Sequence, residues 1–305
     1  MIRRWFRAYL SLVYAAAWLI TVAGGAAGAE SSIPAWSAFT MQATRFGSTA
    51  TAVVERQRVA AAAATPAFID SPRGRPLEAT HAEVQRLSIT VTLEITAGRR
   101  VQLENHLWSD PHTNTPLYLV RTRFGLKDYH QQFRFTREGV FRRQREPSSA
   151  REAGKPPESW TKRGEHFYPY SRESAGCPPI IESSQLIHLA EELWADPSAP
   201  PGPLCVFHKR QVHRVSVQPQ PPQPIRFDYL ERGTDGEQRR AGTVSVPGMR
   251  LASQPIGSYR GNVEDFVRDG TFFYLSPEGR WPLVAVGEMP LFGRVEMRLK
   301  EITFR

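Results

Sequence analysis

Residues 204–217, with the sequence LCVFHKRQVHRVSV, bring together one cysteine, two histidines and three cations. Thiolate and imidazole groups are common ligands of zinc, and histidine is the most frequent general acid or base in enzymes. The β-branched content of residues 206–217 predicts one strand, on which alternate side chains point to opposite faces. His208 and His213 are five positions apart, so on that strand they cannot bind one metal ion. We therefore interpret both histidines as structural or surface residues.

Short motifs elsewhere in the chain give no stronger indication of catalysis. Residues 159–162, SWTK, match the Ser-x-x-Lys pattern of penicillin-recognising enzymes, but that serine must begin a buried helix and the sequence has no Lys-Thr-Gly strand. Gly-x-Ser-x-Gly, His-Glu-x-x-His, phosphate-loop and dinucleotide-binding motifs are also missing from the sequence. We therefore predict no catalytic residue, no metal site and no cofactor, and an enzyme is the less favoured class of protein.

The two cysteines of the sequence are Cys177 and Cys205. An isolated pair in an exported protein predicts one disulfide bond, because the extracytoplasmic compartments are oxidising. The bond would link residues 28 positions apart. By the loop-entropy model it would stabilise the fold by about 3–4 kcal/mol.

The amino-terminal sequence indicates export. Arg3, Arg4 and Arg7 precede an uncharged apolar run that ends in the small residues Ala27-Gly28-Ala29. This pattern is typical of a secretory signal peptide over residues 1–29, and we expect a periplasmic protein. The alternative is an uncleaved membrane anchor, since about 20 apolar residues can span a bilayer. No later stretch is long enough to span, so contact with a membrane after cleavage would be peripheral at most.

Positive charge is concentrated in one part of the sequence. Cleavage after residue 29 would leave 36 Lys and Arg against 30 Asp and Glu, whereas residues 121–163 alone hold twelve cations and five acids. An exported protein seldom meets nucleic acid, so an anionic component of the envelope, such as lipid head groups, is the favoured partner. The candidate basic surface comprises Arg134, Arg142, Arg143 and Arg145. The alternative is an ordinary solvated strand face.

Alternating apolar residues predict a single, mostly β domain over residues 30–305, built on a curved antiparallel sheet. Residues 86–95 and 99–108 are expected to form a hairpin, and residues 183–194 the one helix packed on the sheet. Along residues 129–136 the alternation places Arg134 on the solvated face. Residues 144–179 are expected to form a long irregular insertion, and residues 218–224, QPQPPQP, a polyproline spacer. A change of alternation predicts a β-bulge near Lys300 and Glu301.

Two stretches resemble a known group of proteins. ENHLWSDPHTNTPLYLVRTRFGLKDYHQQFRFTREGVFRR begins at Glu104, and FYLSPEGRWPLVAVGEMPLFGRVEMRLKEI ends at Ile302. Their order of Trp, Asp-Pro and basic strands, with a closing Phe-Gly-x-Val strand, is similar to exported bacterial proteins known only as domains of unknown function. Those proteins resemble the lipoprotein-carrier half-barrel, a curved sheet whose concave face holds acyl chains. The resemblance implies this fold and supplies no catalytic residues.

Two hypotheses about function follow. In the first, the protein is a non-catalytic binder that holds a lipid or acyl chain on a concave apolar face. The candidate lining residues are Leu291, Phe292, Val295, Met297 and Leu299. The alternative role for these side chains is to fill a closed core. In the second, the protein is an envelope interaction or assembly protein that contacts an anionic or protein partner through its basic, aromatic surface. An apolar pocket of a few hundred Å³ would favour the binder.

Overall fold

The computed structural model describes residues 36–95, 98–125, 127–177, 179–186, 202–208, 210–256, 271–277, 281–289 and 293–305. The chain divides into two units, residues 1–34 and residues 35–305, and all described residues belong to the second. The expected signal peptide therefore lies outside the described residues and stays a prediction. None of the described helices combines the length and the apolar character needed to cross a membrane.

The described residues confirm a mostly β fold with one dominant, largely antiparallel sheet. Its first eight strands are β1 (Trp36–Arg45), β2 (Ser48–Ala60), β3 (Glu83–Ile95), β4 (Arg99–Ser109), β5 (Pro116–Phe124), β6 (Tyr129–Phe135), β7 (Gly139–Glu146) and β8 (Lys162–Pro169). The others are β9 (Ile180–Glu182), β10 (Leu204–His208), β11 (Gln211–Gly233), β12 (Gly236–Pro255), β13 (Thr271–Leu275), β14 (Pro282–Met289) and β15 (Gly293–Phe304). Two four-residue helices, α1 (Ala61–Ala64) and α2 (Ala150–Ala153), and short 3₁₀ turns complete the described structure.

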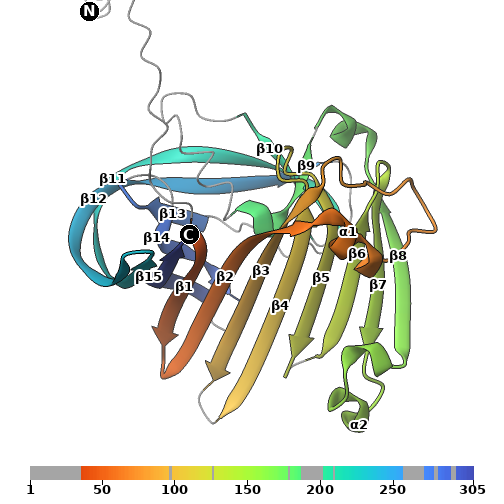
Figure 1. Cartoon of the computed structure of the whole chain (residues 1–305), viewed down its shortest axis with the longest axis horizontal. Helices are drawn as coiled ribbons and strands as arrows, with labels where there is room; N and C mark the ends of the chain where they lie inside the picture. The colour runs from red at the N-terminus through yellow and green to blue at the C-terminus, as the bar shows by residue number, and fades with distance from the viewer. Residues whose placement is uncertain are drawn as a thin grey trace, which may run out of the picture. The chain divides into compact units, whose positions relative to one another are not determined.

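The strands follow the order β8-β7-β6-β5-β4-β3-β2-β1-β15-β14-β13-β12-β11-β10-β9. Strands β1 to β8 form a meander, drawn from red to green in Figure 1. Strand β15 pairs with β1, with β14 through residues 293–298, and with the far end of β11 through residues 301–303. Strands β11 to β15 therefore close into a ring, which requires a strongly curved sheet.

The meander has one face that is mainly apolar. Cross-strand partners lie on the same face of a sheet, and the register joins Leu87 to Leu107, Leu107 to Leu119 and Leu119 to Phe133. We call this the apolar face. Strands β9 and β10 lie over its β5–β8 end, where the ring of Phe207 packs 5.9 Å from that of Phe135. Residues 61–80 cover part of the opposite face, which we call the polar face, with Phe68 packed between Trp108 and Tyr118.

Several local predictions are confirmed. Strands β3 and β4 form the expected hairpin. The β-bulge falls at Lys300, because Thr40 pairs with Glu301 while the next residue, Met41, pairs with Leu299. The β11–β12 hairpin turns between Gly233 and Gly236.

Two predicted irregular segments contain strands. Strand β11 runs through residues 218–224, so the prediction of a polyproline spacer is wrong. A register irregularity between Gln220 and Gln223 accommodates two of the prolines where no ladder hydrogen bond is required. Strand β8 lies inside the expected insertion at 144–179, and most of its side chains are exposed, so it lacks apolar alternation. Of the expected helix at 183–194, residues 183–185 form a 3₁₀ turn and residues 187–194 lie outside the described residues.

Candidate functional site

A pocket among the described residues has a volume of about 960 Å³ and a mainly apolar surface. It lies at one end of the meander, between the β4–β5 turn, the β6–β7 turn and the segment that follows β8. The lining residues are Leu77, Thr113, Thr115, Thr136, Arg137, Glu138, Tyr170, Ser171, Arg172, Ser174, Cys177, Pro179 and Ile180. We call this the large pocket. Its volume falls in the range of small-molecule sites, roughly 300–1,000 Å³.

A second pocket, of about 380 Å³, adjoins the first and is more basic. The two share Tyr170, Ser171 and Ser174 as lining residues. His166 and Arg210 bring positive or protonatable groups to this second space, which we call the basic pocket. Burial, and then the nearby charges of Arg142, Arg210 and Arg73, lower the pKa of His166. His166 is therefore mainly neutral at neutral pH, and Arg210 supplies the fixed positive charge.

Tyr170 stands between the two pockets. Its backbone N–H donates to the carbonyl of Glu138 at 2.9 Å, which extends the β7–β8 pairing by one step. Burial raises the pKa of its hydroxyl, so the group is a neutral donor at physiological pH. Within the described part of the chain no group forms a hydrogen bond with this hydroxyl, which leaves it available to a ligand.

A disulfide bond fixes the wall of the large pocket. Cys177 and Cys205 are bonded, with their Cα atoms 5.6 Å apart, as the cysteine count predicts. The bond ties the segment after β8 to strand β10, and both half-cystines are buried. The walls of the large pocket are therefore held by a covalent link as well as by strand pairing.

The β4–β5 turn forms another wall, and Asp110 organises it. Burial alone would raise the pKa of Asp110, but hydrogen bonds from Thr80 and from the backbone N–H groups of Thr113 and His112 outweigh burial and lower the pKa to about 2. The Asp110 N–H in turn donates to the carbonyl of Thr115 at 2.9 Å. Asp110 thus positions two pocket residues, Thr113 through its carboxylate and Thr115 through its backbone N–H.

Because folding depresses the pKa of Asp110, we expect its contribution to stability to be complete above about pH 4 and lost as the pH falls towards 2. This contribution to the free energy of unfolding is about 2 kcal/mol. The Asp110→Asn variant keeps the side-chain oxygen but has no charge to titrate. Urea unfolding at pH 7, 4 and 2 should show the stability gap between wild type and variant closing as the pH falls. Asp235→Asn, in an exposed turn, is the control, and a gap that stays constant for Asp110→Asn contradicts the prediction.

The predicted lipid-lining residues lie elsewhere. Val295 packs in a buried cluster with Ala43, Ala50, Leu93 and Val101, and Met297 lies against that cluster. Leu299 is also buried. Leu291 and Phe292 fall outside the described residues. Val295 also borders a separate pocket of about 380 Å³. None of the described members lines the large pocket or the basic pocket.

The four predicted surface arginines do not form one surface. Arg134 is only 6% exposed, so its assignment to the solvated face is wrong. The covering segment places Phe68 against its guanidinium, which donates to the carbonyl of Leu117 at 2.9 Å. Arg142 points to the apolar face, over the ring of Tyr168. Arg143 and Arg145 lie on the polar face, because Arg142 between them pairs with Phe133 of the apolar face.

The two histidines of residues 204–217 also differ from their prediction. The chain turns between His208 and Gln211, so the segment is the β10–β11 hairpin and not one strand. Both rings therefore lie on the same face, 6.3 Å apart. His208 contacts the hydroxyl of Ser183 and His213 contacts the amide of Gln211. Among the described residues they belong to no group of three potential metal ligands.

His166, Tyr170 and Arg163 are site residues that the sequence did not predict. The segment HFYPY, residues 166–170, did carry a usable pattern, because its first, third and fifth residues alternate as on one face of a strand.

Comparison with known proteins gives a structural likeness and no family. No protein-family model matches the sequence, and no curated protein matches it. The chain is similar to a crystal structure described as a beta-barrel-like protein of domain of unknown function DUF1849 from Brucella abortus. The TM-score is 0.47 and the identity 10%, over 90% of this chain and 98% of that chain.

Proposed function

We propose that the protein is a non-catalytic binding protein for a small anionic amphiphile, a molecule with an apolar body and one acidic head group. The observation that carries this proposal is the pair of adjoining pockets around Tyr170, one mainly apolar and one basic. Fatty acids and lysophospholipids belong to this chemical class. The lipoprotein-carrier resemblance favours the same class, although the expected lining residues near the carboxyl terminus are replaced by those of the large pocket.

The two pockets would divide the ligand between them. The apolar body would enter the large pocket, where burial of apolar surface contributes about 25 cal/mol per Å². The acidic group would lie in the basic pocket, where Arg210 offers a charge-assisted hydrogen bond. The hydroxyl of Tyr170, at the shared wall, could donate to the same head group.

Hydrogen bonding among the lining residues favours binding over catalysis. The hydroxyl of Ser174 donates to the backbone carbonyl of Ser171 at 2.7 Å. Nucleophilic catalysis needs a hydroxyl bonded to a base. The described residues of the two pockets do not make such a pair.

We also propose that the protein acts outside the cytoplasm, in the periplasm, after removal of residues 1–29. The disulfide bond between Cys177 and Cys205 supports this location, because such bonds persist in oxidising compartments. Fractionation of cells that produce the full chain, with mass determination of the mature protein, tests the location and the cleavage site together.

Dodecanoate is a suitable probe of the binding proposal, with dodecanol as its uncharged analogue. We expect dodecanoate to bind and Arg210→Gln to weaken it roughly tenfold, equivalent to about 1.4 kcal/mol, while dodecanol binding changes little. Isothermal titration calorimetry measures both ligands. Arg214→Gln, an exposed arginine on the adjoining strand β11, is the matched control.

A second variant tests the large pocket separately. Leu77→Trp places a bulky side chain at its wall and should reduce binding of both probes. Failure of dodecanoate to bind, or equal effects of Arg210→Gln and Arg214→Gln, would overturn the proposal.

A further inference from the structure

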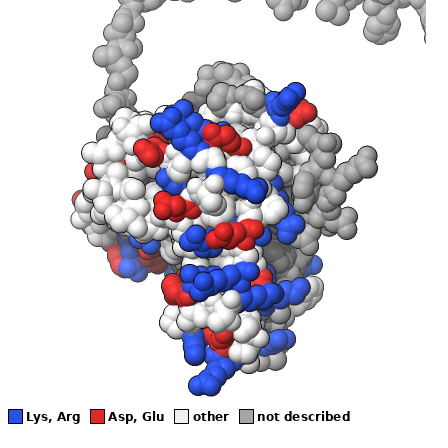
Figure 2. Space-filling view, turned by 90° about the vertical axis from the view of Figure 1, so that its right-hand side faces the viewer, with Lys and Arg blue, Asp and Glu red and all other residues white. Residues whose placement is uncertain are grey.

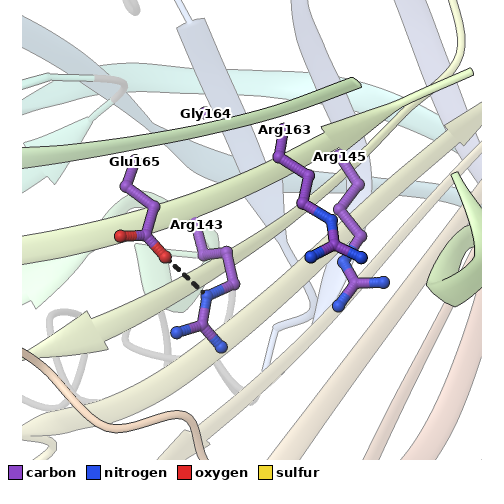
Figure 3. Close-up of a pocket in the computed structure, with 5 residues that line it drawn as sticks. All are labelled: Arg143, Arg145, Arg163, Gly164 and Glu165. Atoms are coloured by element: carbon purple, nitrogen blue, oxygen red, sulfur yellow. Dashed lines mark hydrogen bonds and ion pairs between the residues drawn. The ribbon is translucent and has the colours of Figure 1, made fainter. Parts of the chain in front are cut away.

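Strands β7 and β8 place two arginines directly opposite each other on the polar face. In the antiparallel register Arg145 pairs with Arg163 and Arg143 pairs with Glu165. The guanidinium groups of Arg145 and Arg163 lie side by side, while Arg143 turns towards Glu165 (Figure 3). These residues and Gly164 line a pocket of about 510 Å³, separate from the two pockets around Tyr170.

The two pairs differ in charge balance. Arg143 forms an ion pair with Glu165 at 3.0 Å. In contrast, neither Arg145 nor Arg163 has an ion-pair partner among the described residues. Arg145 donates to the backbone carbonyl of Glu158, which holds the guanidinium in place without neutralising it. Like charges opposite each other on adjacent strands destabilise a sheet, and a bound anion would remove that repulsion.

The excess of positive charge at Arg145 and Arg163 is local, because the surrounding surface is of mixed charge. The side of the molecule turned to the viewer in Figure 2 carries acidic side chains interspersed among the Lys and Arg residues. A uniformly basic surface would attract anions without selecting a position. Two adjacent arginines without acidic partners, on a surface of mixed charge, attract an anion to one position.

We propose that Arg145 and Arg163 bind a tetrahedral oxyanion of the phosphate type, either a free phosphate compound or the phosphate of a lipid head group. A guanidinium presents its N–H donors in a planar fork that matches phosphate oxygens, and two such forks can hold one phosphate from two sides. The hydrogen bond to Glu158 orients one fork in advance. The site does not depend on the amphiphile pockets, and its test is separate from theirs.

Inorganic phosphate and pyrophosphate are the soluble probes, titrated into the protein by calorimetry in a phosphate-free buffer. We expect binding that weakens at least tenfold in Arg145→Gln and in Arg163→Gln. Arg239→Gln is the matched control, because Arg239 is exposed on the β11–β12 hairpin and paired with Asp228 at 2.7 Å. His130, opposite Arg145 on β6, is a local reporter whose imidazole NMR signals should shift with the phosphate titration.

Two vesicle preparations distinguish the sources of the phosphate group. The protein would co-sediment with phosphatidylglycerol-containing vesicles, and not with pure phosphatidylcholine vesicles, if the site binds an anionic lipid head group. The Arg163→Gln variant should then lose this co-sedimentation. Phosphate binding without sedimentation would assign the site to a soluble phosphate compound. Phosphate that does not bind, or binds equally well to the two glutamine variants, would overturn the proposal.

A charge-reversal variant controls for loss of folding. Arg163→Glu places a carboxylate opposite Arg145, so it should abolish phosphate binding while the melting temperature stays the same or rises. A variant that loses binding only because it unfolds would instead melt at a lower temperature. Retained phosphate binding in Arg163→Glu would also count against the proposal.

Discussion

Replacing Arg121 by methionine is expected to destabilise the fold by about 3–5 kcal/mol, because it leaves the Glu182 carboxylate buried without its cation. The two groups are 3.4 Å apart, with side chains 14% and 2% exposed. Arg121 lies on β5 and Glu182 on β9, so the pair joins the apolar face of the meander to the strand that covers it. Arg121 also donates to Asn105 at 3.0 Å. Chemical unfolding of Arg121→Met at pH 7 measures the loss.

A double-mutant cycle separates the missing pair from the missing side chain. Glu182→Gln removes the charge and keeps one oxygen, which can accept from the Ser184 N–H as one carboxylate oxygen does now. The variant Arg121→Met with Glu182→Gln should therefore be more stable than Arg121→Met alone, with a coupling of about 1–3 kcal/mol. Arg143→Met breaks an exposed pair and should cost at most about 1 kcal/mol. Equal costs for Arg121→Met and Arg143→Met would show that burial of the pair is unimportant.

Alternation along the chain predicted the parts of the fold in which one strand face is buried and the other is not. Residues 86–95 show this most clearly, because their odd-numbered side chains form the apolar face while the even-numbered ones are mainly polar. The bulge at Lys300 was also visible, since an extra residue in one strand reverses the alternation beyond it. The alternation and the reversal at the bulge both depend on neighbouring residues in the sequence, and both are present in the folded protein.

Other features depend on residues that are distant in sequence. Arg134 alternates as a solvated residue should, yet residues 61–80 fold over it and supply Phe68 as a cover. The turn between His208 and Gln211 contains no Gly, Pro or Asn, so nothing local marks the hairpin. The prolines of residues 218–224 suggested a spacer. The irregularity in pairing that lets β11 contain them depends on the partner strand, β12, which is distant in the sequence from its turn onward.

The candidate site was the least predictable part for the same reason. The large pocket takes its walls from the β4–β5 turn, the β6–β7 turn and the segment after β8, and only the sheet order brings these together. Strand β8 is at the edge of the sheet, where one neighbour suffices and exposed side chains need no apolar pattern. The cysteines were the exception, since a covalent bond between two residues can be predicted from their number and the expected compartment alone.

Removing the disulfide bond is expected to lower the stability of the protein by about 3–4 kcal/mol. The change is Cys177→Ala with Cys205→Ala, and the physical reason is the added freedom of the unfolded chain once residues 28 positions apart are no longer linked. For a domain of this size the melting temperature should fall by roughly 10 °C. Because Cys177 lines the large pocket, dodecanoate binding should weaken as well. Calorimetric melting and ligand titration measure the two effects.

Reduction of the wild type supplies the control, because it removes the same covalent link without changing either residue to alanine. Reduced wild type should melt near the double variant, and the variant itself should not respond to reductant. Before reduction, thiol labelling of the unfolded wild type should modify neither cysteine. Labelling of both, or an unchanged melting temperature after complete reduction, would contradict the prediction. Protein made in a reducing compartment should reproduce the lower stability, because the native pocket wall would then be held by strand pairing alone.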